Sequence, residues 1–373
     1  MFNQFKLIKQ PPAGFYLSTE DWAAQTNLKP KEAYYKIIDY GDGPETFTSP
    51  KGLEDSVHWR FIEEQQRKPP PTFLAVIPGG RVWGANGAVI APDNKLLWDL
   101  SLQYGIAIED HPIFKMKSLP PLQERKDTVA VLTFCASHYY YHWMFDVLPR
   151  LELLRREDIA FRKIVLNYNG FPPFQKDTLS SLGISQDQII PCHRHFHLKA
   201  KKLVVPSPVG YTGHMPKWTT AFLRKHFLPQ ERGKGRSERL YISRAYAKTR
   251  RVLNEDRIIN ILSKYGFKTV LPELMTVAEQ ARLFSSAEAI VSAHGGGLTN
   301  LVFCRAGTKV LEFFSPNYVN VLYWVLSNHV NLDYYYLIGE GERPAEYVDP
   351  HLVWDNITVN LDQLTGILKK MGM

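Results

Sequence analysis

The sequence has few cysteines and no apolar stretch long enough to cross a membrane. Its three cysteines, Cys135, Cys192 and Cys304, are far apart and show no CxxC spacing, which indicates reduced thiols rather than a disulfide framework. The longest weakly charged apolar run, residues 128–137, is roughly half as long as a membrane span. The N-terminal sequence also lacks the continuous apolar core of a secretory signal. We therefore expect a cytoplasmic protein.

Two widespread functional motifs are missing as well. No Gly-Lys-Ser/Thr triplet is present, which excludes a Walker-type phosphate loop. No G-x-S-x-G turn is present either, which excludes the nucleophile of an α/β-hydrolase. Zinc-finger spacing and an aromatic-rich RNA-binding signature are also absent, so nucleic acid is the least supported partner.

The charged residues favour an anionic partner. The sequence has 45 Lys and Arg against 37 Asp and Glu, which gives a net charge of +8. An excess of this size suits a phosphorylated small molecule or an anionic membrane surface. The run "KAKK" at residues 199–202 would help a peripheral membrane contact. Charge alone does not choose between these two partners.

The length and the pattern of the chain indicate two α/β domains. A chain of 373 residues is too long for one ordinary core. After a Gly- and charge-rich stretch at residues 229–238, short apolar segments alternate with helical patterns, which predicts a parallel sheet covered on both faces. One of these helices would begin at Thr276, with Glu279 completing a capping box. We expect a first domain over residues 71–230, a second over 237–340, an N-terminal extension of unknown role over 1–70, and a C-terminal segment over 341–373.

Three consecutive glycines mark the first candidate site. In "SAHGGGLTNLVF", Gly295, Gly296 and Gly297 follow an expected strand and open an expected helix. Glycines permit a tight turn and a close approach to a ligand, and the start of a helix suits phosphate. His294, Thr299 and Asn300 could reach the same ligand. The spacing does not match the dinucleotide pattern G-x-G-x-x-G, because position 300 is Asn. The alternative interpretation is a tightly packed turn with no ligand.

A second cluster is basic and follows an earlier strand. "YISRAYAKTRRVLNED" places Ser243 and Arg244 at the end of that strand, and Arg250 and Asn254 at the approach to a helix. Arginines at this edge of the sheet could bind a diphosphate bidentately, although a solvated basic loop is the alternative. Glu312, within the apolar strand "KVLEFF", needs an arginine or the hydroxyls of a ribose as partners.

A third cluster lies on a helix in the first domain. His138, His142, Asp146 and Arg150 in "HYYYHWMFDVLPRL" recur every four residues and would share one face. Pro149 interrupts the helix, but His142 and Asp146 precede it and should be neighbours. A histidine–carboxylate pair can take a proton from a hydroxyl. The alternative interpretation is a buried ion pair that anchors the helix.

Taken together, the segments "HWMFDVLPRL", "YISRAYAKTRRVLNE", "SAHGGGLTNLVF" and "KVLEFF" resemble glycosyltransferase family 61 in their order and spacing. The resemblance implies a GT-B fold, in which two Rossmann-like domains face each other across a cleft and the last helix crosses back to the first domain. It also implies an inverting, metal-independent glycosyltransferase of polysaccharide biosynthesis, which transfers a hexose or pentose from a nucleotide sugar to a glycan or glycolipid acceptor. The absence of an Asp-x-Asp dyad agrees with a reaction that needs no metal or other cofactor.

The resemblance also assigns roles to individual residues. Asp146 would be the general base, with His142 orienting it or sharing its proton. Arg244, Arg250 and the amides of the three glycines would stabilise the departing diphosphate, Glu312 would hold the ribose, and His294 and Asn300 would contact the diphosphate or the sugar. The full expected nucleotide-sugar site consists of Ser243, Arg244, Arg250, Asn254, His294, Gly295, Gly296, Gly297, Leu298, Thr299, Asn300 and Glu312. The alternatives are a non-catalytic nucleotide-sugar-binding protein and a GT-B-like epimerase.

Overall fold

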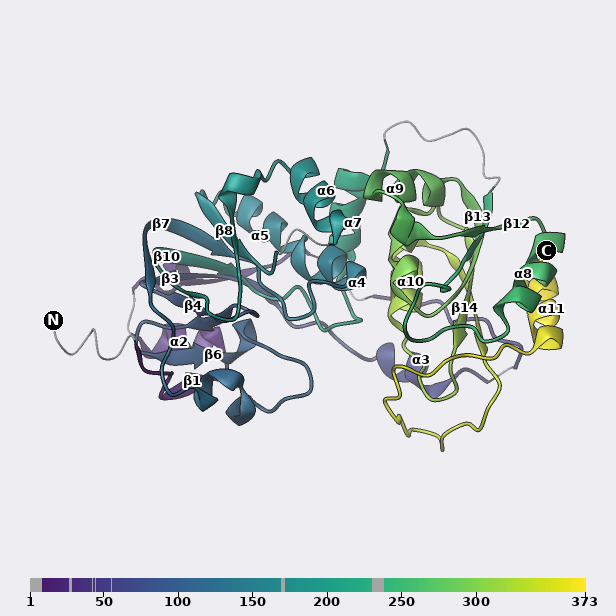
Figure 1. Cartoon of the computed structure of the whole chain (residues 1–373), viewed down its shortest axis with the longest axis horizontal. Helices are drawn as coiled ribbons and strands as arrows, with labels where there is room; N and C mark the ends of the chain where they lie inside the picture. The colour runs from purple at the N-terminus through teal and green to yellow at the C-terminus, as the bar shows by residue number, and fades with distance from the viewer. Residues whose placement is uncertain are drawn as a thin grey trace. The chain divides into compact units, whose positions relative to one another are not determined.

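The protein is an α/β protein made of two compact units (Figure 1). A computed structural model describes residues 9–26, 29–41, 43, 45–54, 56–168, 172–229 and 238–373. The first unit comprises residues 1–41 and 70–211, and the second comprises residues 42–69 and 212–373. These limits differ from the expected domains, because the stretch 1–70 is shared between the units and residues 212–229 belong to the second. Most of the expected 229–238 linker lies outside the described residues.

The first unit contains a mixed sheet. Its strands are β1 (Gly14–Tyr16), β2 (Tyr35–Ile38), β3 (Thr72–Pro78), β4 (Arg81–Trp83), β5 (Ala88–Ile90), β6 (Lys95–Leu97), β7 (Gln123–Val131), β8 (Lys163–Leu166), β9 (Ile189–Pro191) and β10 (His197–Pro206). Their main order is β1-β6-β5-β4-β10-β7-β8-β9, with β3 also paired to β10 and β2 to β3. Its helices are α2 (Thr19–Gln25), η1 (Lys31–Ala33), η2 (Trp98–Leu100), η3 (Ile108–Asp110), η4 (Pro112–Lys115), α4 (Tyr140–His142), η5 (Trp143–Val147), α5 (Arg150–Arg156), α6 (Pro173–Ser181) and η6 (Gln186–Gln188).

Only part of this sheet has the parallel pairing expected of a Rossmann-like domain. Strands β10, β7, β8 and β9 pair in parallel, whereas β4 pairs antiparallel with β5 and β10, and β3 pairs antiparallel with β10. The short strands β4, β5 and β6 are joined by tight turns, in which Gly87 and Asn94 adopt positive φ. Tight turns between neighbouring strands require antiparallel pairing, so the Rossmann-like description holds for one side of the sheet only.

The second unit contains the parallel sheet that the sequence predicts. Its strands are β11 (Glu238–Ile242), β12 (Phe267–Val270), β13 (Ala287–Ala293), β14 (Lys309–Phe314) and β15 (Asp333–Ile338), in the order β12-β11-β13-β14-β15. All four pairings are parallel. Nearly every residue of β13 and β14 is buried, as expected for central strands covered on both faces.

The helices of the second unit include those that the sequence predicts after Thr276 and at the three glycines. They are α3 (Trp59–Glu64), α7 (Lys217–Phe227), α8 (Glu255–Lys264), η7 (Pro272–Leu274), α9 (Val277–Ser285), η8 (Gly296–Phe303), α10 (Leu322–Val330) and α11 (Leu361–Lys370). The capping box of α9 is confirmed: the Thr276 side chain accepts from the Glu279 N–H, and the Glu279 side chain accepts from the Thr276 N–H. The three glycines do open a helix, but η8 is a 3-10 helix rather than an α-helix.

The N-terminal segment 42–69 is part of the second unit because its aromatic side chains complete that core. Phe61 of α3 is fully buried and its ring lies 4.9 Å from Tyr336 and 5.3 Å from Trp324. The indole N–H of Trp324 donates to the Thr48 carbonyl at 2.9 Å. The extension whose role the sequence left undecided therefore contributes structure to both units.

The C-terminal helix α11 also belongs to the second unit. The sequence analysis expected this helix to return to the first domain. Leu364, Ile367 and Leu368 of α11 are fully buried and share one hydrophobic cluster with Ile258 of α8 and Leu311 of β14. An amphipathic helix stays where its apolar stripe finds an apolar partner. For α11 that partner is provided by α8 and β15.

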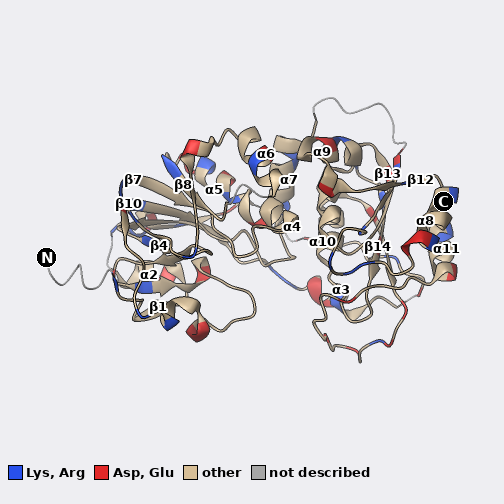
Figure 2. Ribbon diagram, in the orientation of Figure 1, with Lys and Arg blue, Asp and Glu red and all other residues tan. Residues whose placement is uncertain are grey.

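Charged residues of both signs occur in both units. Figure 2 shows basic and acidic residues distributed over both of them. None of the helices in the described part of the chain is long and apolar enough to cross a lipid bilayer.

Candidate functional site

The strand order of the second unit creates a crevice at the ends of β11 and β13. From β11 the chain proceeds to β12 on one side, and then to β13, β14 and β15 on the other. Ligands of open parallel sheets bind where the strand order reverses in this way, beyond the carboxyl ends of the strands. Ile242 pairs with Ser292 at the ends of these strands. The basic loop after β11 and the glycine turn after β13 therefore start side by side.

Arg244 lies directly against the glycine turn. Its Nε donates to the Arg250 carbonyl at 2.9 Å and its Nη2 donates to the Thr249 carbonyl at 2.8 Å. A Cβ atom added to Gly295 would come within 1.7 Å of Arg244 Nη1. Glycine at this position is therefore required by the arginine beside it, and the two clusters form one candidate anion-binding site, called the anion pocket below.

Arg250 joins the same pocket from the other end of the loop. Its Nε donates to the His294 carbonyl at 3.1 Å and its Nη1 donates to the Val353 carbonyl at 2.5 Å. The guanidinium carbon lies 5.9 Å from the centre of the Tyr318 ring. Arg250 has a φ of 52°, a left-handed conformation that costs about 1 kcal/mol or more for a residue with a Cβ. The loop keeps this conformation because the backbone and the side chain of Arg250 both form hydrogen bonds.

The two guanidinium groups have no carboxylate partner in an ion pair within the described residues. Their hydrogen bonds go to backbone carbonyls. Glu255, the nearest acid that Arg244 contacts, accepts from its backbone N–H at 3.2 Å. Burial, and then the charge of Arg250, lower the pKa of Arg244 to about 10, so Arg244 remains protonated at neutral pH. Two neighbouring cations, half-buried and compensated only by carbonyls, favour binding of an anion with several oxygens.

His294 and Glu312 form a buried pair behind the anion pocket. His294 Nδ1 lies 2.6 Å from Glu312 Oε1, and the Tyr334 hydroxyl donates to Glu312 Oε2 at 2.5 Å. Burial and the charges of Arg250 and Arg244 lower the pKa of His294 well below its ordinary value, so the imidazole is neutral. The Glu312 side chain is 0% exposed. With both oxygens bonded and enclosed, the Glu312 side chain orients His294 in this structure, and its expected contact with a ribose stays a prediction.

Four other expected ligand residues hold the pocket together from inside. The Asn300 amide donates to Gln280 Oε1 at 2.6 Å and to the Gly297 carbonyl at 3.1 Å. Thr299 Oγ1 lies 3.4 Å from the Tyr323 hydroxyl, and Leu298 is fully buried. The Asn254 side chain forms two hydrogen bonds with the Val359 backbone, at 2.7 and 3.1 Å. These bonds satisfy buried polar groups, so the side chains support the backbone of the site, and their expected contacts with a nucleotide sugar stay predictions.

The three glycines have different reasons to be glycine. A Cβ on Gly297 would lie 2.8 Å from Ile242 Cγ2, so Gly297 permits close packing of η8 on β11. A Cβ on Gly296 would meet no protein atom within 4 Å. Gly295 makes room for Arg244, and Ser243 Oγ accepts from the Ala245 N–H at 3.1 Å to hold the same loop. The open side of the turn is therefore at Gly296.

Replacing Gly295 with alanine is expected to displace the Arg244 guanidinium and weaken binding of inorganic diphosphate about 10-fold or more, the effect of losing a hydrogen bond to a charged group. Stability should change little, because the atom that must move ends a flexible side chain. Calorimetric titration checks this in a double-mutant cycle with Arg244→Ala. Once Arg244 is absent, Gly295→Ala should weaken diphosphate binding almost no further. An equal loss of diphosphate affinity in the wild type and in Arg244→Ala would contradict the contact between Gly295 and Arg244.

In the first unit, His142 and Asp146 form the pair that the sequence predicts. His142 Nδ1 lies 2.7 Å from Asp146 Oδ2, and the side chains are 18% and 8% exposed. Residues 143–147 form a π-helical turn, η5, which continues α4 before Pro149. Single π-helical turns often mark functional positions. In the described part of the chain, His142 Nε2 has no hydrogen-bond partner, so it can accept a proton while Asp146 holds Nδ1–H.

His138 and Arg150, which the sequence places on the same helix face, do not join the pair formed by His142 and Asp146. His138 is exposed and its ring lies 4.0 Å from that of Tyr139. Arg150 is 3% exposed and donates to the carbonyls of Val131, Thr133 and Pro206. The π-helical turn and Pro149 rotate the chain after Asp146, which directs Arg150 into the core. Burial lowers the pKa of Arg150 to about 10.

Aromatic side chains that sequence analysis did not assign surround His142. Ring centroids lie 5.8 Å away for Tyr104, 5.6 Å for Phe134, 6.2 Å for Tyr139 and 5.4 Å for Tyr141. Tyr139 and Tyr141 precede His142 in sequence. Tyr104 lies in a separate loop, and nothing in its local sequence indicates this contact.

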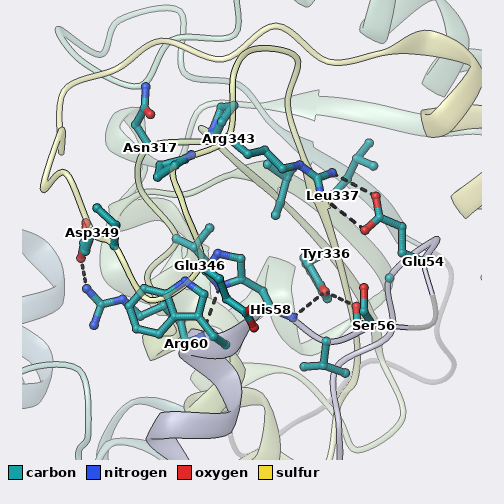
Figure 3. A pocket seen from close by; sticks show the side chains of 18 of the residues that line it. Glu54, Ser56, His58, Arg60, Asn317, Tyr336, Leu337, Arg343, Glu346 and Asp349 are labelled. Carbon is teal, nitrogen blue, oxygen red and sulfur yellow. Dashed lines mark hydrogen bonds and ion pairs between the residues drawn. The ribbon is translucent and has the colours of Figure 1, made fainter.

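A cavity of about 330 Å³ lies next to the anion pocket within the second unit (Figure 3). Tyr318, whose ring lies 5.6 Å from that of His294, stands between Asn317 and Val319, which line the cavity. The cations of its lining are already paired, Arg343 with Glu54 at 3.1 Å and Arg60 with Asp349. Between these two sites, the arginines without a carboxylate partner among the described residues are therefore Arg244 and Arg250 of the anion pocket and not those of this cavity. No group of three or more His, Cys, Asp or Glu residues that could hold a metal ion occurs among the residues described.

Comparison with known proteins covers the part of the chain that contains these residues. The family model described as Glycosyltransferase 61 matches residues 140–311, which include His142, Asp146, Arg244, Arg250 and the glycine turn. Two rice (Oryza sativa subsp. japonica) proteins are similar. Beta-1,2-xylosyltransferase XYXT1 is 24% identical over 217 residues, 52% of this chain and 46% of the relative. Beta-1,2-xylosyltransferase RCN11 is 32% identical over 98 residues, 26% of this chain and 16% of the relative.

The chain thus matches less than half the length of either relative. The family match runs from the His142–Asp146 pair to β14 and ends one residue before Glu312. Residues 140–311, just under half of the chain, therefore match glycosyltransferase family 61.

Proposed function

We propose that the protein transfers a sugar from a nucleoside diphosphate donor to a hydroxyl of a glycan, with inversion at the anomeric carbon and without a required metal ion. The observation that carries this proposal is the pair of arginines, Arg244 and Arg250, held against the glycine turn without a carboxylate partner among the described residues. A diphosphate supplies the negative charge and the several acceptor oxygens that such a pocket suits.

The donor half of the reaction would use the anion pocket. As the bond from the anomeric carbon to the diphosphate breaks, negative charge grows on the departing phosphate oxygens. Arg244, Arg250 and the backbone N–H groups at the open side of the glycine turn would stabilise that charge, the kind of effect that is usually the largest catalytic term. These protein cations supply the charge that a divalent ion supplies in other transferases, which supports metal independence.

The acceptor half of the reaction would use His142 and Asp146. His142 Nε2 would take the proton of the attacking hydroxyl, while Asp146 holds the Nδ1–H and stabilises the imidazolium that forms. His142 is the more exposed of the two, at 18% against 8%, so we favour it as the base and Asp146 as the residue that orients it. The proposal includes the GT-B arrangement, in which residues of both units act on one pair of substrates.

Both curated relatives are named as β-1,2-xylosyltransferases, which makes a pentosyl donor the first to test. Saturating the correct nucleotide sugar should raise the unfolding temperature, because a ligand at 100 times its Kd stabilises the folded state by about 2.7 kcal/mol. UDP-xylose and UDP-hexoses are then incubated with neutral oligosaccharides, with and without excess chelator. Transfer that survives chelation supports the proposal. Activity lost to chelator and restored by manganese would contradict metal independence.

The same assay separates the alternative functions. A changed sugar on the nucleotide without an acceptor would indicate an epimerase. Saturable donor binding without any product would indicate a non-catalytic nucleotide-sugar-binding protein.

A further inference from the structure

Two large aromatic rings are exposed beside His142. Tyr104 is 53% exposed and Tyr139 is 60% exposed. Their ring centroids lie 5.8 and 6.2 Å from that of His142. Tyrosine rings bury much apolar area when they are covered, so two exposed rings beside a proton acceptor form a surface suited to a ligand.

A third aromatic side chain, Phe134, packs against both Tyr104 and His142. The Phe134 ring lies 5.8 Å from Tyr104 at an interplanar angle of 78°, and 5.6 Å from His142. The Phe134 backbone N–H donates to Asn167 Oδ1 at 2.6 Å, which fixes the strand end that carries it. Tyr104 lies in the loop between η2 and η3, and Tyr139 immediately precedes α4. Two segments far apart in sequence therefore place a ring each on the same histidine.

The surface suits an uncharged ligand with apolar faces. Tyr104, Tyr139 and Phe134 carry no charge at neutral pH. Burial and the nearby His142 lower the pKa of His138, the other titratable group in contact with Tyr139, which leaves it neutral as well. The anion pocket, in contrast, presents two cations. A sugar ring has C–H faces that pack on aromatic rings and hydroxyls at its edge that reach a hydrogen-bonding group.

We propose that Tyr104 and Tyr139 form the acceptor platform, on which a neutral sugar ring stacks so that one of its hydroxyls meets His142 Nε2. This inference rests on the proposed function and specifies its acceptor: an uncharged glycan rather than a phosphorylated or acidic one. The two tyrosines determine acceptor affinity and play no part in donor binding.

The test uses Tyr104→Ala, Tyr139→Ala, the double variant and the corresponding Tyr→Phe variants. Each alanine variant should raise the acceptor KM at least about fivefold, the lower end for stacking on an aromatic ring. The donor KM and donor hydrolysis without acceptor should stay within about twofold, a margin below one such stacking interaction. The phenylalanine variants should behave like the wild type. Tyr211→Ala is the matched control, because Tyr211 is an exposed tyrosine of the same unit, at 45%.

Three outcomes would overturn the platform: an unchanged acceptor KM in the double alanine variant, a fall in kcat with unchanged acceptor KM, or equal losses in the phenylalanine and alanine variants. The second would make the rings positioning groups for His142, and the third would replace stacking with hydroxyl hydrogen bonds. Calorimetric titration with neutral tetrasaccharides of xylose, glucose and mannose tests the platform without turnover. Wild-type binding that the alanine substitutions weaken supports it even if no donor is transferred, whereas no binding to any of them contradicts it.

Discussion

Replacing His142 with alanine is expected to lower the rate of transfer about 10²- to 10⁴-fold, the usual contribution of a general base. Affinity for the nucleotide sugar should be nearly unchanged, because His142 belongs to the first unit and the anion pocket is built from the second. Single-turnover transfer measures the first effect and calorimetric titration of the donor measures the second. Unchanged turnover would remove His142 from the reaction.

Asp146→Asn distinguishes the two members of the pair. The Asp146 carboxylate lies 2.7 Å from His142 Nδ1, and an amide in its place can donate to that nitrogen and stabilise the wrong tautomer. If His142 is the base, His142→Ala should lose at least as much activity as Asp146→Asn. If Asp146 is the base, Asp146→Asn should abolish transfer and His142→Ala should retain most of it. The pH dependence of kcat/KM in His142→Ala provides a second readout, because the fall in rate at acidic pH, where a general base is protonated, should disappear when the base is removed.

Arg244→Ala is expected to weaken binding of nucleoside diphosphates about 10- to 100-fold, since hydrogen bonds to charged groups contribute about 1.5–3 kcal/mol. The loss should shrink at high salt, where electrostatic attraction is screened. Arg251→Ala is the matched control, because Arg251 is the exposed neighbour of Arg250. Calorimetric titration with a nucleoside diphosphate measures both. Equal affinity of Arg244→Ala and the wild type would contradict the anion pocket.

The pKa of Arg244 adds a condition to that experiment. Burial lowers this pKa to about 10, and a cation keeps its charge at any pH well below its pKa. The contribution of Arg244 to donor affinity should therefore be constant between about pH 7 and 9, and should fall as the pH rises through about 10.

Local patterns in the second unit predict its fold well. Its strands and helices alternate with ordinary lengths, and signals such as the Thr276 capping box mark the start of a helix. The rule that parallel strands present their carboxyl ends at one edge was enough to predict that Arg244 and Gly295 meet. The local spacing of His142 and Asp146 predicted their pairing in the same way, because both residues precede the proline.

The contacts that the sequence did not predict depend on partners far away in sequence. The carboxylate of Glu312 is occupied by Tyr334 of the next strand, a contact set by the register that pairs Glu312 with Tyr336. Asn254 bonds the backbone of Val359, 105 residues later. Arg150 turns inward because of a π-helical turn that has no sequence signature. A single sequence without structure identifies polar residues near a site but not which of them are already bonded.

The way the chain is shared between the units limits how the donor-binding unit can be isolated. The chain changes unit after residues 41, 69 and 211, so a fragment starting at residue 212 would leave Trp324 and Tyr336 without Phe61 over them. Lys370 Nζ donates to the Gly52 carbonyl at 2.7 Å, which places the end of α11 beside the segment that such a truncation removes. A circular permutant that attaches residues 45–69 behind Met373 through a short linker would restore the missing piece, and simple dissection at the glycine-rich stretch would not.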